Sequence, residues 1–293
     1  MNDNKNHASK CCKDQEPHII CESNNMNYIY NVAYFDWILK TQDIEKLAQA
    51  ANCQILNFKF PSIDMFKEFR EDETMGYQSF TLFTAYPGLL MGIGNLHDIG
   101  IKGAYKLGFS FDYVNGLPYL PGSSLKGILR SVFPGQRKDD KEEYKDYLLG
   151  LMAELNITGV QKENLDDLES EIFDFHDVFL GAYPDPEQKE DRQFLDTEFV
   201  TPHVRLKNPI PISFVKVKPM VKFRFHFLLK DGKILSAENK LTLFRTLILE
   251  LGVGAKTNVG FGRFTASEQK ERIHDEPGLN PSRYPQNNNW KKK

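Results

Sequence analysis

The most regular alternation of hydrophobic and polar positions lies at residues 221–229, which read VKFRFHFLL. Side chains of a strand alternate between its two faces, so the apolar positions share one face and Lys222, Arg224 and His226 share the other. We therefore expect a strand with one buried face and one locally basic face.

Other β-rich or alternating segments predict further strands. Residues 79–86 are closed by Pro87 and Gly88, and we expect them to form the first strand of the main domain. Shorter strands are expected at residues 107–113, 177–184 and 259–264. The glycine-punctuated residues 88–100 are expected to form a loop.

Apolar residues at helical spacing predict two core helices. The first spans residues 123–133, with Ser123 or Ser124 as its N-cap, and the second begins at Ser236 and runs to residue 251. Further helices are expected at residues 36–51, in two pieces, and at 63–70, and residues 135–170 are typical of a helical insertion with a solvated face.

These elements divide the chain into three parts. Residues 1–78 form a leader with a helical extension, residues 79–264 form the main domain, and residues 265–293 form a polar tail. Because residues 199–209 carry two prolines and few core candidates, residues 194–208 are expected to project as an arm. The order strand, helix, strand, strand, helix, strand favours an α+β, ferredoxin/RRM-like sheet with insertions.

Composition narrows the classes of function. The chain has 293 residues, 41% of them hydrophobic, and a formal net charge of -3, so nucleic acid would have to bind at local basic patches. The sequence contains no long apolar run, so it predicts no membrane segment. The cysteines at positions 11, 12, 21 and 53 lack zinc-site spacing, and we interpret them as free thiols in a reducing cytoplasm.

Two cationic side chains stand out near the start of the first core helix. Lys126 and Arg130 are four residues apart, so they lie together on the helix, off its apolar stripe. A phosphate favours cations beside free backbone N–H groups at a helix start. The alternative interpretation is a pair of solvated charges on an ordinary amphipathic helix, and the spacing does not separate the two.

A glycine-rich stretch, GVGAKTNVGFGRF, follows the second core helix at residues 252–264. Its glycines predict positive φ angles and a close approach to something large, such as a polymer backbone. A phosphate-binding loop of the P-loop or dinucleotide type would need strand, glycines and helix in the reverse order, so those functions are disfavoured. The alternative is a helix C-cap with no further role.

The two motifs together resemble the RAMP superfamily of CRISPR-associated proteins. The motifs are GLPYLPGSSLKGILR at residues 116–130 and GAKTNVGFG at residues 254–262, in the same order as in that superfamily. Within it, the loop, the TPH segment ending at His203 and the NPIP run at 208–211 look most like the family of the sixth subunit of the Cmr, or type III-B, effector complex. The resemblance covers residues 79–264.

This resemblance implies a non-catalytic backbone subunit of a ribonucleoprotein for antiviral defence. Such a subunit binds CRISPR RNA near its 3′ end and positions target RNA, beside paralogous RAMP backbone subunits and small helical subunits. It implies no cofactor and no metal. A projecting hairpin, the thumb, would lie within residues 194–208. The RNA-binding positions carried over by the resemblance, with the two basic thumb residues, are Ser123, Ser124, Lys126, Arg130, His203, Arg205, Gly252, Gly254, Lys256, Thr257, Asn258, Gly260 and Gly262.

Two other functions compete with this one. A RAMP-type RNA endonuclease acting on CRISPR RNA or target RNA would use His97 or His203 as general acid or base and Lys256 to stabilise the transition state. Asp98 occupies the loop where the target-cutting paralogues keep an aspartate, but its surroundings do not follow their pattern. The third candidate is an assembly subunit that contacts only proteins.

Overall fold

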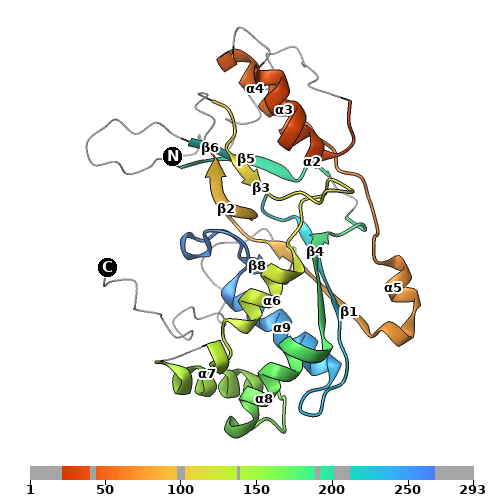
Figure 1. The fold of residues 1–293 in the computed structure, drawn as a ribbon, viewed down its shortest axis with the longest axis vertical. Helices are drawn as coiled ribbons and strands as arrows, with labels where there is room; N and C mark the ends of the chain where they lie inside the picture. Colours follow the sequence, from red (N-terminus) through yellow and green to blue (C-terminus); the bar gives the residue numbers. More distant parts are fainter. Residues whose placement is uncertain are drawn as a thin grey trace.

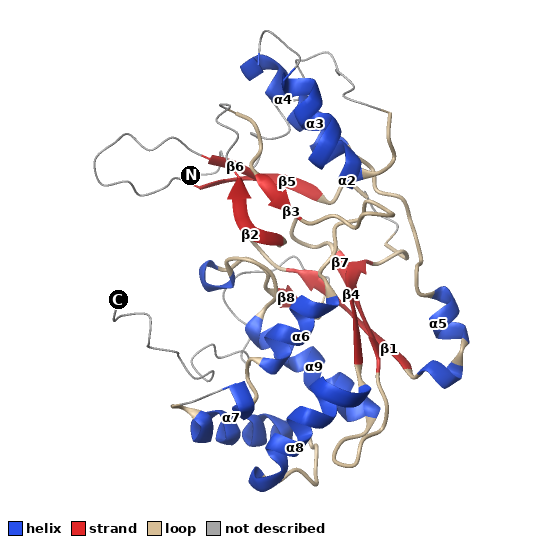
Figure 2. Cartoon of the chain, in the orientation of Figure 1, coloured by secondary structure: helices blue, strands red, loops and turns tan. Residues whose placement is uncertain are grey.

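The computed structural model describes residues 22–39, 44–97, 103–136, 139–188, 192–200 and 212–267. This part of the chain has an α+β fold (Figures 1 and 2). Its central sheet has four strands in the order β4-β7-β1-β8. The strands are β1 (Tyr77–Thr84), β4 (Val178–Pro184), β7 (Lys222–Leu228) and β8 (Phe264–Thr265), and every pair is antiparallel.

The strands expected at residues 79–86, 177–184 and 221–229 are confirmed as β1, β4 and β7. Their register places aromatic residues opposite each other, as in the β1–β7 pair Phe80 and Phe225, whose rings stack 5.1 Å apart. Such cross-strand aromatic pairs stabilise a sheet beyond the area that they bury.

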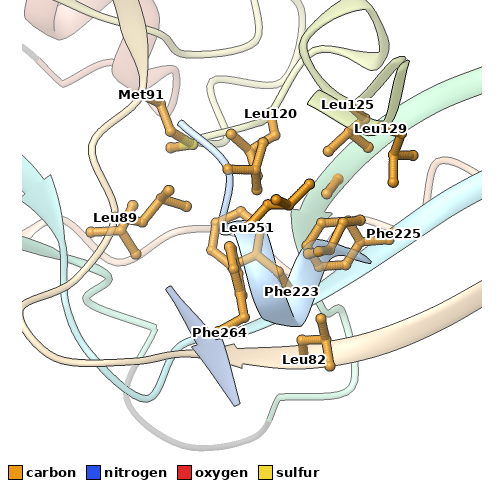
Figure 3. Close-up of a cluster of buried hydrophobic side chains, with 14 of the residues drawn as sticks. Leu82, Leu89, Met91, Leu120, Leu125, Leu129, Phe223, Phe225, Leu251 and Phe264 are labelled. Atoms are coloured by element: carbon orange, nitrogen blue, oxygen red, sulfur yellow. The ribbon is translucent and has the colours of Figure 1, made fainter. Parts of the chain in front are cut away.

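Two helices cover one face of this sheet, α6 (Gly122–Arg130) and α9 (Ala237–Leu251). Figure 3 shows their apolar side chains, including Leu125, Leu129 and Leu251, meeting Phe223 and Phe225 of β7. All five of these side chains are buried, and each stabilises the fold by about 1.5–3 kcal/mol. Both core helices are therefore confirmed.

The two helix starts differ from each other. The Ser236 side chain caps α9 by accepting a hydrogen bond from the Asn239 N–H, as expected. The predicted serine cap of α6 is wrong, because the helix begins at Gly122 after Pro121. A Cβ on Gly122 would lie 1.8 Å from the Phe179 carbonyl oxygen, so the helix starts where its backbone meets β4.

The segment between α6 and β4 is helical, as predicted. It comprises η3 (Pro134–Gln136), α7 (Lys141–Glu154), η4 (Lys162–Asn164), α8 (Leu165–Ser170) and η5 (Glu171–His176). Its buried side chains, among them Tyr144, Leu148, Leu165 and Leu168, belong to the main core. These helices thus form the lower lobe in Figure 1.

The N-terminal helices lie at the opposite end of the molecule (Figure 1). They are α2 (Met26–Tyr28), η1 (Ile29–Ala33), α3 (Tyr34–Leu39) and α4 (Ile44–Asn57). The Tyr30 hydroxyl donates to the Lys106 carbonyl at 2.5 Å, and the Tyr34 hydroxyl accepts from the Tyr105 N–H at 2.8 Å. This region is therefore packed into the main core. Cys53 of α4 is disulfide-bonded, so the interpretation of the cysteines as free thiols is wrong for this residue.

Two small antiparallel sheets lie beside the N-terminal helices. One pairs β2 (Gly92–His97) with β3 (Leu107–Phe109), and the other pairs β5 (Leu195–Val200) with β6 (Ile212–Val217). The loop predicted at residues 88–100 thus contains a strand. The strand predicted at residues 107–113 is shorter than expected.

The base of the predicted arm belongs to the core. Phe194 is completely buried and stacks on Phe60 with ring centroids 5.3 Å apart, and Leu195 is 1% exposed. The expectation that residues 194–208 lack core contacts is wrong at this end, because Phe194 fills a space between β5 and the N-terminal segment. Residues 201–211 lie outside the described residues.

The second face of the central sheet is not an open basic surface. Lys222 and Arg224 pair with the buried Asp185 at 3.4 and 3.1 Å. His226 is 3% exposed, lies 3.9 Å from the Phe66 ring, and contacts the Tyr77 hydroxyl through Nδ1 at 2.7 Å. Phe66 immediately precedes α5 (Lys67–Glu71), which η2 (Glu73–Met75) follows, and its contact with His226 covers part of the face predicted to be locally basic.

The buried imidazole predicts an acid sensitivity. Burial, with the nearby Arg224 and Arg70, lowers the pKa of His226 from 6.5 to about 3, so the folded protein keeps the ring neutral while the unfolded chain protonates it. The free energy of unfolding should therefore fall by about 2 kcal/mol between about pH 7.5 and about pH 5. Denaturant titrations of the wild type and His226→Gln at both pH values test this. An equal pH dependence in both proteins would show that His226 is not responsible.

Candidate nucleic-acid interface

The glycine-rich stretch begins where α9 ends. Gly252, Gly254, Gly260 and Gly262 all have positive φ angles, as predicted, between 69° and 106°. The predicted strand at 259–264 is largely wrong, because η6 (Thr257–Val259) and a turn precede the two-residue β8. We call residues 252–263 the glycine loop.

Three of the four glycines are required by the protein's own backbone. A Cβ on Gly252 would lie 2.6 Å from the Gly262 carbonyl oxygen, one on Gly254 2.5 Å from that of Leu90, and one on Gly262 2.1 Å from that of Val253. Two backbone hydrogen bonds hold the chain segments at these close contacts: Val253 N donates to Gly262 O, and Ala255 N donates to Leu90 O, both at 2.8 Å. Internal packing therefore requires glycine at these three positions, and their approach to an external polymer stays a prediction.

The tip of the glycine loop faces solvent instead. Lys256 and Asn258 are exposed, and Thr257 is half-buried. A Cβ on Gly260 would meet nothing nearer than Pro87 Cδ at 3.5 Å, so the space around this glycine is open. The loop therefore presents a rigid, outward-facing edge with one cation.

Lys256 has a backbone conformation that L-residues with side chains rarely adopt. Its φ and ψ of 59° and 36° lie in the left-handed region, at a cost of about 1–2 kcal/mol relative to glycine. Its ammonium group lies 4.9 Å from the centre of the Phe214 ring. A lysine at this position, in a loop that uses glycine at other positive-φ positions, suggests a functional rather than a structural requirement.

A cavity of about 290 Å³ opens beside the glycine loop. The β2–β3 hairpin, β6, η1 and the loop itself form its walls. Most of its lining is apolar and includes Tyr30, Met91, Phe109, Phe214 and Ala255, and the basic residues among those that line it are Lys106 and Lys256.

The two cations predicted to act together on α6 have different surroundings. Arg130 donates from Nε to Glu169 at 2.9 Å and from Nη1 to Asp174 at 2.8 Å, so its charge is neutralised within the fold. Ser123 and Ser124 are exposed, and Lys126 is half-buried. The prediction of a paired cationic site is therefore revised to one cation, Lys126, beside two hydroxyls.

This difference predicts separable effects of two alanine substitutions. Lys126→Ala should flatten the salt dependence of RNA affinity by about one unit without changing stability, since it removes one phosphate contact. Arg130→Ala should reduce the free energy of unfolding by about 1–3 kcal/mol, because it removes the ion pair and hydrogen bond that Arg130 makes with the buried Glu169. Filter binding over a salt series and denaturant unfolding of both variants distinguish the two roles. Equal loss of stability in both would contradict them.

Several predicted positions lie outside the described residues. These are His203 and Arg205 of the expected arm, and Asp98. His97 is the last residue of β2. Within the described ranges, no three His, Cys, Asp or Glu side chains come together as a metal site would require, and no helix has the length and apolar character to cross a bilayer.

Sequence reasoning missed the cavity and the partners of Arg130. Glu169 lies 39 residues after Arg130, within the insertion predicted at residues 135–170, and Asp174 lies 44 residues after Arg130, just beyond that insertion. The cavity is assembled from four distant segments. The one sequence signal available for it was Lys256, a side chain retained among glycines.

Comparisons with known proteins agree with this architecture. A model of the RAMP superfamily matches residues 81–265, which is more than half of the chain, so the chain belongs to the RAMP superfamily. It is similar to the CRISPR system Cmr subunit Cmr6 of Pyrococcus furiosus, with 25% identity over 259 residues, 68% of this chain and 72% of that protein. It is also similar to the CRISPR system CMR subunit Cmr6 of Saccharolobus solfataricus, with 26% identity over 170 residues, 56% of this chain and 50% of that protein.

A solved structure has the same fold. It is the cryo-EM structure of the Type III-B Cmr-beta bound to cognate target RNA, which matches with a TM-score of 0.52 at 20% identity over 84% of this chain and 91% of that one. The resemblance to a Cmr6-like RAMP protein is thus confirmed.

Proposed function

We propose that this protein is an RNA-binding backbone subunit of a type III-B CRISPR effector complex. The observation that carries the proposal is the exposed edge of the glycine loop, where a strained Lys256 is kept beside internally locked glycines. A cation that is held on a rigid backbone fixes the place of an RNA phosphate without reading the base sequence. A subunit that accepts guides of varied sequence requires contacts of this kind. The similarity to two Cmr6 subunits supports the choice of complex.

The main domain is proposed to be ferredoxin-like. Along the chain its elements run β1, α6, β4, β7, α9 and β8, and the sheet order is β4-β7-β1-β8. A β-α-β-β-α-β unit with its two helices on one face has this organisation. The β5–β6 hairpin, with residues 201–211 between its strands, is the proposed thumb.

The proposed contacts with RNA divide into two groups. Side chains and open backbone on the exposed surface make direct contacts, whereas Gly252, Gly254 and Gly262 shape the loop from within. Arg130 is assigned a structural role by its carboxylate partners. The direct contacts are Ser123, Ser124, Lys126, Lys256, Thr257, Asn258 and Gly260, together with His203 and Arg205 of the thumb.

The proposed partners are CRISPR RNA, bound near its 3′ end, target RNA, and the neighbouring RAMP and small helical subunits. Cleavage of target RNA is assigned to those neighbours rather than to this chain. The experiment that tests the assignment is purification of the tagged protein from its own host, followed by sequencing of the bound RNA. Guide sequences with a common 3′ boundary are expected. Recovery of the neighbouring subunits without RNA would favour a protein-only assembly role.

A further inference from the structure

The cavity beside the glycine loop has the size and lining of a site for one planar group. Its volume of about 290 Å³ is at the lower end of the range for ligand pockets, which suits a single ring system better than a large cofactor. Tyr30, Phe109 and Phe214 contribute aromatic rings to the lining, and Gly92 and Gly108 leave part of the wall without side chains.

Lys256 lies both at the exposed edge of the glycine loop and in the lining of the cavity, and it is the one cation among the described residues that does so. Its ammonium group covers the Phe214 ring, which is 1% exposed. A cation–π contact of this kind contributes about 0.5–1 kcal/mol at an exposed site, which does not offset the cost of the left-handed backbone at Lys256. The position is therefore better explained by a ligand that needs both the charge and the ring.

The combination of an aromatic cavity with a cation at its edge identifies the chemical class of that ligand. An aliphatic side chain would fill the apolar wall without using the cation, and a free phosphate would use the cation without using the cavity. A nucleotide within a single-stranded RNA uses both, because its base is flat and stacks on aromatic rings while its phosphate is anionic.

We propose that this cavity receives one unstacked base of the bound RNA, with Lys256 contacting the adjacent phosphate. When the ammonium turns from the ring to the phosphate, the Phe214 face that it covers becomes available to the base. The inference rests on the proposed RNA-binding function and adds to it a discrete base-binding site, formed by β2, β3, β6 and the glycine loop.

Photo-crosslinking of single-stranded RNA carrying 4-thiouridine tests the site in the full-length protein. Crosslinks mapped by mass spectrometry are expected on Tyr30, Phe109 or Phe214. Ala255→Leu fills the cavity beside Lys256 and should lower the yield of these crosslinks about tenfold, while total RNA affinity falls less than about threefold because phosphate contacts persist.

The matched control is Ala237→Leu, which enlarges an equally half-buried alanine at the start of α9. Thermal melts of both variants show whether each is folded, and Lys256→Gly provides a second test if Ala255→Leu does not fold. It should lower the same crosslinks. Crosslinks elsewhere, or cavity crosslinks unchanged in the folded variants, would overturn the base site while leaving RNA binding intact. No binding by the wild type would instead overturn the proposed function itself.

Discussion

Asp177→Ala is expected to reduce the free energy of unfolding by about 3 kcal/mol or more, since breaking a buried ion pair by removing one partner costs about 3–5 kcal/mol. The Lys240 ammonium lies 2.9 Å from Asp177 Oδ2, and both side chains are 0% exposed. Lys240 also donates to the Lys230 carbonyl at 2.9 Å, and Glu171 is 3.8 Å away. These contacts join η5 to the start of α9, so the loss of Asp177 leaves a buried cation poorly compensated.

Denaturant unfolding measures this effect, and two comparisons interpret it. Lys162→Ala breaks pairs with Glu142 and Asp146 whose carboxylates are 70% and 67% exposed, so its effect should be below about 1 kcal/mol. Replacing both partners, Asp177→Leu with Lys240→Met, should recover most of the lost stability, because no charge then remains buried. A single variant as stable as the wild type would show that the pair is not buried in solution.

Gly262→Ala is the second substitution expected to have a large effect. The added Cβ would lie 2.1 Å from the Val253 carbonyl oxygen, and the φ of 69° is unfavourable for alanine. Overpacking and the left-handed backbone together should cost about 2–5 kcal/mol. The loop must open to accept the methyl group, so the hydrogen bond between Val253 N and Gly262 O should be lost as well.

Gly260→Ala is the control for this variant because it also has a positive φ, of 97°, but its Cβ would meet only Pro87 Cδ at 3.5 Å. It should lose about 1–2 kcal/mol from backbone strain alone. Thermal or denaturant unfolding of both variants gives the difference. Equal destabilisation would mean that strain, rather than the internal contact, requires glycine at residue 262.

The hydrophobic pattern predicted the helices and strands in which buried residues recur at a regular spacing along the chain. The strand at β7 and the apolar stripe of α9 both follow from it, because every second residue, or every third and fourth, faces one core. The pattern did not predict that Phe66 would cover His226, since that contact joins residues 160 positions apart through a segment with little regular structure. The pairing of charged side chains was the least predictable property, because Arg224 and Arg130 pair with carboxylates that are distant in sequence and come close only in the folded chain.

The sequence predicted the unusual backbone of the glycine loop, but not the groups that its glycines pack against. The glycines correctly marked an unusual backbone, yet their spacing does not reveal whether the approaching group is internal or external. The structure shows Leu90 and Val253 in that role. The lysine between the glycines is the residue to which we assign RNA binding, and its one described packing contact is with the Phe214 ring.

The central claim, that the glycine loop binds RNA through Lys256, is tested most directly by comparing the wild type with Lys256→Gly. Relief of backbone strain should offset the greater flexibility of glycine and the lost contact with Phe214, so stability should stay within about 1 kcal/mol of the wild type. Lys67→Ala removes an equal charge from the exposed surface of α5 and serves as the control.

The measurement is the equilibrium dissociation constant for single-stranded RNA over a series of salt concentrations. The account predicts that Lys256→Gly binds about threefold to tenfold more weakly at low salt, with a salt slope shallower by about 0.7, while Lys67→Ala behaves as the wild type. An affinity and a slope identical in wild type and Lys256→Gly would contradict the claim.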